Sequence, residues 1–326
     1  MSTAPAAPPT APSAPARPSL EHALAGELDA VAAAGLWREL REIESAQDPS
    51  VVLRGREVLL FCSNNYLGLA NHPDVVGAAR ETAERYGENA ASSRLIPGHI
   101  RAHRGLANHP EVVAAARDAA ERYGASAASS RLISGHMRVH RELEERIAAW
   151  KGCEAALAFS TGYQANIGVV NALVGPGDTI VSDELNHASL IDAARLSRAR
   201  IAVFRHNDAS HLEDVLKQQT DARRVLVATE SVFSMDGDAA PLADIVALAK
   251  RFGAWTLVDE AHGAGVFGKR GAGLADELGL TADIDVHVGT LGKALGSFGA
   301  YVAGSRRLAD WLVNRARSFI FTTGLP

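Results

Sequence analysis

Apolar and polar positions alternate with helical spacing at the start of the chain. Leucine, valine and isoleucine recur every three to five residues, at Leu20, Leu24, Leu28, Val31, Leu36, Leu40 and Ile43. This spacing predicts a helix that continues past Gly35. Residues 51–62 are apolar around the polar group Arg54-Gly55-Arg56, which predicts two short strands joined by a turn.

Beyond residue 150 the chain alternates short apolar runs with amphipathic stretches. The apolar runs predict strands at 179–181, 201–204, 225–228, 255–258, 286–288 and 300–303. The amphipathic stretches predict helices at 141–150, 164–174, 188–199, 209–218 and 241–252. Alternation at this spacing favours an α/β fold with a mostly parallel sheet covered by helices on both faces.

Residues 1–19 hold six of the 13 prolines, which predicts a disordered, extended tail. A mitochondrial transit peptide is the alternative, but Arg17 is the only basic residue in the segment. The predicted organisation is therefore a tail at 1–19, an N-terminal helix with short strands at 20–66, and a large domain at 67–326.

A tandem repeat interrupts this large domain. Residues 68–104 and 105–141 agree at 28 of 37 positions. A solenoid needs about three or more stacked repeats, so two copies indicate a local duplication. The second copy leads directly into the helical pattern after residue 141, and we expect it to occupy the native position.

The composition excludes several classes of protein. The chain has 326 residues, 47% of them hydrophobic, and a formal net charge of −5, which gives no basic surface for nucleic acid. Cys62 and Cys153 form no disulfide framework or zinc motif. Apolar runs are too short for a membrane span. We expect a soluble, cytoplasmic protein with no metal, nucleic-acid or membrane partner.

Only five lysines occur, and Lys293 alone follows a buried-strand pattern between glycines, at Gly289, Gly292 and Gly296. Glycines let a planar group approach the backbone, and an apolar setting lowers the pKa of an amine from its reference of about 10.4. Such a lysine is a candidate for Schiff-base chemistry. A solvated loop lysine is the alternative.

Asp259 follows an apolar strand, at the edge where open α/β sheets bind ligands. Its carboxylate could pair with a protonated pyridine nitrogen or could cap a helix. The letters DEAH (259–262) also occur in nucleotide triphosphatases, but no GxxxxGK[ST] loop accompanies them. HExxH is absent too, so no zinc hydrolase is predicted.

Two further motifs open predicted helices. Residues 160–166 (STGYQAN) follow an apolar run and predict a phosphate site at a helix N-terminus. Asn186 and His187 precede another helix, where simple capping is the alternative. The order of phosphate-type helix start, histidine, strand-end aspartate and glycine-flanked lysine is what a phosphorylated pyridine aldehyde needs.

These motifs resemble the α-oxoamine synthases, which are pyridoxal-phosphate enzymes of the fold-type I group. The matching stretches lie at 63–73, 130–135, 182–192, 230–242, 258–268, 289–304 and 315–326. The resemblance implies the large domain of that fold. The family continues beyond FIFTTGLP (319–326) into a small C-terminal domain, which this sequence largely lacks.

The resemblance also implies roles for individual residues. Lys293 would form the Schiff base and move protons, Asp259 would pair with the pyridinium nitrogen, and His187 would stack on the ring. The remaining expected contacts are Ser234 and His262 near the phenolic oxygen, Gly162, Tyr163 and Thr290 at the phosphate, Thr322 or Thr323 toward a neighbouring subunit, and Arg41 and Asn65 at the substrate.

Within the family, the stretches most resemble the branch that makes 8-amino-7-oxononanoate for biotin. That implies a decarboxylative condensation of L-alanine with a pimeloyl thioester of CoA or an acyl carrier protein, in a homodimer. Glycine C-acetyltransferase, another α-oxoamine synthase and an inactive truncated fragment are the alternatives.

Overall fold

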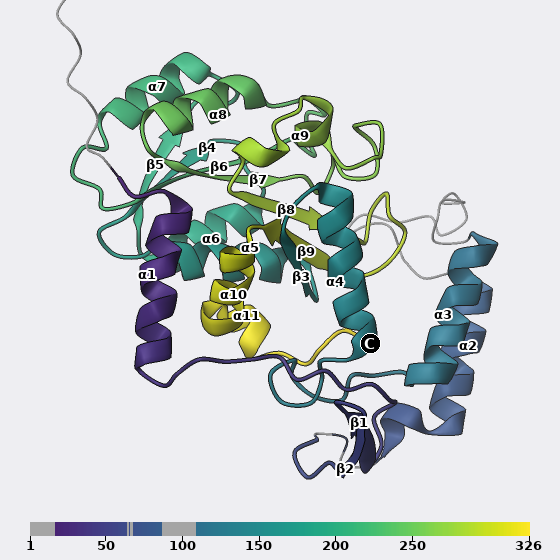
Figure 1. Ribbon diagram of the computed structural model, residues 1–326. Helices are drawn as coiled ribbons and strands as arrows, with labels where there is room; N and C mark the ends of the chain where they lie inside the picture. The colour runs from purple at the N-terminus through teal and green to yellow at the C-terminus, as the bar shows by residue number, and fades with distance from the viewer. Residues whose placement is uncertain (1–16, 64, 66–67, 87–108) are drawn as a thin grey trace, which may run out of the picture.

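A seven-stranded sheet forms the centre of the molecule, in the order β3-β9-β8-β7-β6-β4-β5 (Figure 1). The computed structural model describes residues 17–63, 65, 68–86 and 109–326. The strands are β3 (Ala155–Phe159), β4 (Thr179–Asp183), β5 (Arg200–Phe204), β6 (Val225–Glu230), β7 (Trp255–Asp259), β8 (Val286–Thr290) and β9 (Ala300–Gly304). From β5 to β8 neighbouring strands are parallel, and β9 is antiparallel to β8 and β3. The predicted α/β fold with a mostly parallel sheet is confirmed.

Helices cover both faces of this sheet, as predicted (Figure 1). One face carries α1 (Leu20–Ala33), α5 (Gly162–Leu173), α6 (Ala188–Ser197), α10 (Arg306–Arg315) and α11 (Arg317–Ile320). The other carries α4 (Arg138–Lys151), α7 (Ala209–Lys217), α8 (Leu242–Arg251) and α9 (Leu274–Glu277). Because successive strand residues face opposite sides, Leu257 packs in one core and Val258 in the other.

The predicted N-terminal helix is shorter than its apolar spacing suggested. It ends at Ala33, and Gly35 then adopts a left-handed conformation with φ of 67°. Leu36 is consequently 62% exposed, and Ile43 lies in an extended bridge rather than a helix. The prediction past Gly35 was wrong because glycine readily takes the φ that ends a helix.

The two short predicted strands are present as β1 (Ser50–Leu53) and β2 (Arg56–Leu59), which form an antiparallel hairpin. Arg54 and Gly55 both have positive φ at its turn, as the right-handed twist of a two-residue hairpin requires. In the described ranges, every helix is too short or too polar to span a lipid bilayer.

The end of the predicted tail is part of the fold. The Arg17 guanidinium donates to the carbonyls of Ala222 and Phe252, and the Trp255 indole donates to the carbonyl of Pro18. Ser19 caps α1 through the His22 N–H. The prediction of disorder was therefore wrong for residues 17–19, because these contacts satisfy their polar groups, and residues 1–16 lie outside the described residues.

The two copies of the duplication form neighbouring helices, α2 (Pro73–Tyr86) and α3 (Pro110–Tyr123), which pack on each other (Figure 1). Before α2 lies the short η1 (Leu69–Asn71). The loop after α3 enters the core: Ser129 and Arg131 are buried, and Arg131 binds Glu144. The expected native placement thus holds for this loop of the second copy, while its counterpart in the first copy lies outside the described residues.

Candidate active site

A cavity of about 540 Å³ opens where β4, β6, β7 and β8 end and α5 begins. In parallel sheets all carboxyl ends lie at one edge, so residues far apart in the chain converge there. Seven of the predicted site residues line it: Gly162, Tyr163, His187, Asp259, His262, Thr290 and Lys293. The motif order along the chain was therefore a correct guide to proximity in space.

Lys293 follows β8 in the loop that leads to β9. Its amine is within hydrogen-bond distance of the His262 ring, with Nζ and Nε2 2.8 Å apart. Burial lowers the pKa of this amine, while the negative charges of Asp259 and Glu230 oppose the shift. Burial and the nearby Lys293 also lower the pKa of His262. A desolvated amine of lowered pKa is the form that attacks an aldehyde.

Asp259 ends β7 and is only 6% exposed. Its Oδ2 accepts from the Asn166 amide at 2.8 Å, and its Oδ1 accepts from the Ala261 N–H at 2.9 Å. These two neutral donors hold the carboxylate at the wall of the cavity and leave its charge in place. A buried carboxylate held in this way needs a cation, and a protonated ring nitrogen would supply one.

The N-terminus of α5 and the end of β8 form a small polar corner. A Cβ on Gly162 would lie 3.0 Å from Cγ2 of Thr290, which is closer than an ordinary contact. The absence of a side chain at Gly162 therefore keeps the space beside Thr290 open. The buried Thr290 Oγ1 has no hydrogen-bond partner among the described residues. Thr161 caps the helix through the Gln164 N–H. Free N–H groups beside an unpaired hydroxyl form a site that fits a phosphate.

His187 is held at the start of α6 from two sides. Its backbone N–H donates to Oε1 of Glu230 at 2.6 Å, and its Nδ1 lies 2.8 Å from Oγ of Ser189. The Ser189 hydroxyl also accepts from the Asn166 amide. The imidazole thus lines the cavity in a fixed orientation, as stacking on a planar ring would require.

Three predicted residues lie away from this cavity. Ser234 is exposed in the loop after β6 and does not line it. Arg41 lies in a separate cavity with Thr322 and Thr323. Asn65 caps the turn before η1, accepting from the Ala70 N–H. Each belongs to a loop whose path the sequence pattern does not determine, and their expected contacts with cofactor or substrate stay predictions.

Two polar residues of the cavity, Asn166 and Glu230, had no role assigned from the sequence. Asn166 lies one turn into α5 and bridges Asp259 and Ser189. Glu230 ends β6 directly beside the end of β7, in register with Asp259. The signal for Glu230 was available in the sequence, because it ends an apolar strand as Asp259 does.

A buried ion pair lies behind the cavity. Lys151, at the end of α4, binds the carboxylate of Glu260 and the carbonyl of Ala272, and both charged side chains are fully buried. Glu260 also accepts from the Ala275 N–H at 3.0 Å. Because Glu260 directly follows Asp259, this pair anchors the backbone that carries the site.

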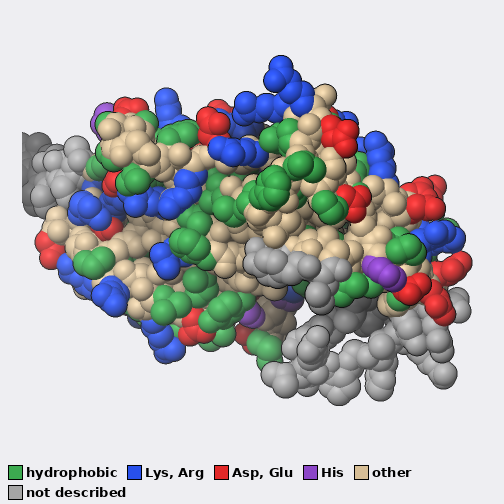
Figure 2. Space-filling model, turned by 90° about the horizontal axis from the view of Figure 1, so that it is seen from below, with side chains coloured by type: hydrophobic (Ala, Val, Ile, Leu, Met, Phe, Trp, Pro, Cys, Tyr) green, Lys and Arg blue, Asp and Glu red, His purple; other side chains and the backbone are tan. Residues whose placement is uncertain are grey.

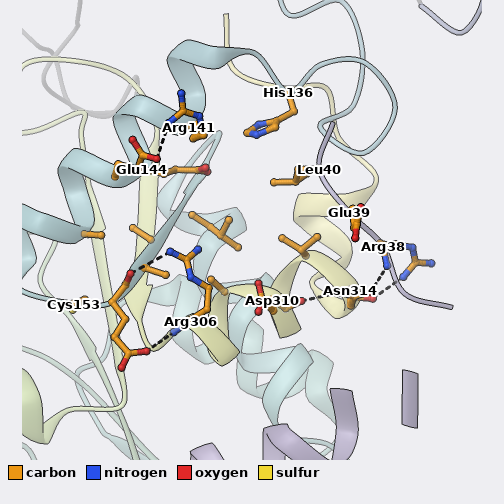
Figure 3. A pocket seen from close by; sticks show the side chains of 18 of the residues that line it. Arg38, Glu39, Leu40, His136, Arg141, Glu144, Cys153, Arg306, Asp310 and Asn314 are labelled. Atoms are coloured by element: carbon orange, nitrogen blue, oxygen red, sulfur yellow. Dashed lines mark hydrogen bonds and ion pairs between the residues drawn. The ribbon is translucent and has the colours of Figure 1, made fainter. Parts of the chain in front are cut away.

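A second cavity, of about 690 Å³, lies between α4, α10 and residues 37–40 (Figure 3). Several of its charged side chains bind other residues: Arg141 pairs with Glu145, Glu144 with Arg131, and Arg306 with the backbone of Glu154. This cavity contains no lysine, so it lacks the amine that the first cavity offers.

Comparisons with known proteins agree with this geometry. The sequence model of the aminotransferase class I and II family matches residues 56–326. The 8-amino-7-oxononanoate synthase of Geobacter sulfurreducens is 48% identical over 307 residues, which cover 94% of this chain and 69% of that protein. That of Anaeromyxobacter sp. strain K is also 48% identical, with 93% and 67% covered.

Solved structures give the same result. Serine palmitoyltransferase of S. paucimobilis with bound PLP–myriocin superposes with a TM-score of 0.61 at 31% identity, covering 93% of this chain and 68% of its own. 8-Amino-7-oxononanoate synthase of Francisella tularensis gives 0.52 at 26%, covering 82% and 65%. The chain therefore belongs to the aminotransferase class I and II family and, within it, to the pyridoxal-phosphate-dependent α-oxoamine synthases.

Proposed function

We propose that this chain catalyses the decarboxylative condensation of L-alanine with a pimeloyl thioester, which yields 8-amino-7-oxononanoate for biotin synthesis. The observation that carries the proposal is the convergence of Lys293, Asp259 and His187 on one cavity with a phosphate-type corner. The names of the relatives support the product. The thioester carrier would be CoA or an acyl carrier protein.

Each part of the cavity would hold one part of the cofactor. The Lys293 amine would bind the aldehyde carbon, and Asp259 would hold the proton on the ring nitrogen. His187 would cover a ring face, while the N–H groups of α5 and the Thr290 hydroxyl would bind the phosphate. The charges of the lining side chains, and their arrangement around the cavity, thus match the parts of the cofactor.

Pyridoxal phosphate, when bound, supplies an electron sink for a carbanion at the amino-acid Cα. The Lys293 amine would remove and return the proton at that carbon. His262, 2.8 Å from its amine, would orient Lys293 for this transfer. Asp259 would keep the ring cationic, so that it draws electrons away from Cα.

The surface supports a homodimer. Hydrophobic side chains gather at several places on the face seen in Figure 2, and Ile133 and Phe321 line the cavity of about 840 Å³ that contains Arg41. Phe61 is 93% exposed, Phe321 65% and Ile133 50%. Exposed apolar groups of this size indicate a surface that another protein covers. A second copy would bring Thr322 or Thr323 toward the neighbouring site.

The test is covalent labelling of Lys293. Purified protein is mixed with pyridoxal phosphate, its visible absorbance is recorded, and the adduct is reduced with borohydride and mapped by mass spectrometry. We expect one adduct, on Lys293, and none in Lys293→Ala. Assays of thiol release with alanine or glycine, and with pimeloyl or acetyl thioesters, then distinguish the proposed reaction from that of glycine C-acetyltransferase. An adduct spread over the other lysines would contradict the proposed site.

A further inference from the structure

Two acidic side chains face the same cavity from neighbouring strands. Glu230 ends β6 and Asp259 ends β7, and the two residues are direct partners in the parallel ladder. Their exposed fractions are 3% and 6%. Two buried carboxylates so close together are not both ionised without cost, because each charge disfavours the other.

The hydrogen bonds show which of the two carries the charge. Asp259 receives two donors, one on each oxygen, from Asn166 and Ala261. Glu230 receives one donor, the His187 N–H on Oε1. No hydrogen bond to its Oε2 occurs in the part of the chain that the structure describes. Glu230 therefore has one donor fewer than Asp259 to stabilise its anion, and its second oxygen has room for a proton.

We propose that Glu230 is a positioning residue of this site: one carboxyl oxygen fixes the backbone of His187, and the other carries the proton that the two neighbouring acids share. Loss of that proton adds a negative charge beside Lys293, and this charge stabilises the positively charged form of the Lys293 nitrogen. This proposal rests on the proposed cofactor site. It adds Glu230 to that site, and the loss of the Glu230 proton can be measured separately from cofactor binding.

The surroundings of Glu230 agree with this assignment. Burial, followed by the charge of Asp259, raises the pKa of Glu230 to about 7. The His187 N–H and the Lys293 amine act in the opposite direction, and Asp183 at the end of β4 adds to the rise. His262 faces the same group of charges from the loop after β7. Glu230 therefore titrates in the physiological range.

The first experiment needs no cofactor. Infrared spectra of the full chain, compared between about pH 6 and about pH 8, on either side of the expected transition, detect the carbonyl stretch of a protonated carboxyl group. We expect one such band to be lost as the pH rises. Glu230→Gln should lack the change, because the amide accepts the His187 N–H but has no acidic proton. Glu184→Gln, at the exposed end of β4, should keep it.

The second experiment uses the cofactor-loaded protein. The pH midpoint of the visible absorbance change is measured in the same three proteins. Removing a charge several ångströms from Lys293 should lower this midpoint by about 1 pH unit in Glu230→Gln. Glu184→Gln should match the unsubstituted protein. The measurement reports on the cation at Lys293 and not on turnover.

The two experiments separate this inference from the proposed function. If no visible band forms with pyridoxal phosphate, the proposed function fails, while the infrared experiment still decides whether Glu230 holds a proton. A carboxyl band that persists in Glu230→Gln, or a midpoint that Glu230→Gln leaves unchanged, would overturn the inference.

Discussion

At the scale of single residues, the amine of Lys293 is subject to two opposing influences. Burial favours the neutral, nucleophilic amine, and the carboxylate of Asp259 favours the cation. His262 lies in contact with the amine and remains a neutral partner because burial and Lys293 lower its pKa. The reactivity of this lysine therefore depends on the charges at the strand ends around it.

Asp259→Asn should lower the pKa of Lys293 further, because the largest influence that raises it is removed. The pH at which the amine becomes nucleophilic should then fall. The shift should be partial, because Glu230 ionises more readily once its neighbour is uncharged. The measurement is the rate at which an amine-reactive reagent labels Lys293 at different pH values, followed by peptide mapping. Lys217 in the same digest, exposed on α7, is the control, and a rise in the Lys293 midpoint would contradict this account.

Strand ends were predictable from the sequence and loops were not. Asp259 and Thr290 end apolar strands, so their proximity follows from the geometry of a parallel sheet. Ser234 lies in a loop whose backbone path depends on tertiary contacts, such as the Asn207 amide donating to the Asp238 carboxylate. Arg41 lies within a segment that was expected to be helical and has no regular secondary structure. The sequence pattern therefore predicted the site residues that lie at the ends of strands and helices, but not those in loops.

At the scale of elements, the ion pair between Lys151 and Glu260 joins the end of α4 to the end of β7. Both side chains are fully buried, so the opposite charge of each compensates much of the hydration that the other loses, with Ala272 and Ala275 supplying further hydrogen bonds. The Gly273 backbone adds to the constraint, since a Cβ there would meet the Glu260 carboxylate at 2.4 Å. The pair and its surrounding loop thus hold the backbone next to Asp259.

Lys151→Met should lower the free energy of unfolding by about 3–5 kcal/mol, because it leaves the Glu260 charge buried and unpaired. The measurement is urea denaturation at neutral pH. Lys217→Met, which changes an exposed lysine on α7, should stay within about 0.5 kcal/mol of the unsubstituted protein. Equal stability of the two variants would show that the buried pair contributes nothing.

The same ion pair predicts that the free energy of unfolding depends on pH in the acidic range. Burial raises the pKa of Glu260, but the neighbouring His287, Lys151 and the Ala275 N–H outweigh it and leave the pKa at about 2. A carboxyl group with a lowered folded-state pKa stabilises the fold above its unfolded-state pKa of about 4.3, and this contribution is lost as the pH falls toward 2. Urea midpoints between these values should fall less steeply in Glu260→Gln than in the exposed control Glu277→Gln. Parallel curves would refute the assignment.

At the scale of the whole molecule, the duplication adds a helix that the core does not use. None of the described side chains of α3 is buried, and among those described in α2 only Ala83 is. The loop after α3, in contrast, contacts the C-terminal residues: the Gly324 N–H donates to the Ser129 carbonyl, and Ser130 forms a β-bridge with Thr323. The repeat was evident in the sequence, but which of its parts enter the core depends on these distant contacts.

Deletion of residues 68–104 should therefore leave the fold and the cofactor site intact. Residues 105–109 repeat the sequence 68–72 and would replace the contact that Ala70 makes with the Ala125 N–H. We expect a urea midpoint equal to or above that of the full chain, and an unchanged borohydride adduct on Lys293. Deletion of 124–137, which removes the buried loop, is the control and should abolish cooperative unfolding. Loss of the adduct in the shorter deletion would contradict the prediction.

The position of β5 at the edge of the sheet has a consequence for how the protein behaves at high concentration. Among the described strands none pairs with its outer side, which can therefore pair with a strand from another molecule, and Ile201 and Val203 are 41% and 52% exposed on it. Arg200 begins the strand and Arg205 directly follows it. Two copies paired through β5 would place these cations together, and their repulsion protects the open edge from aggregation.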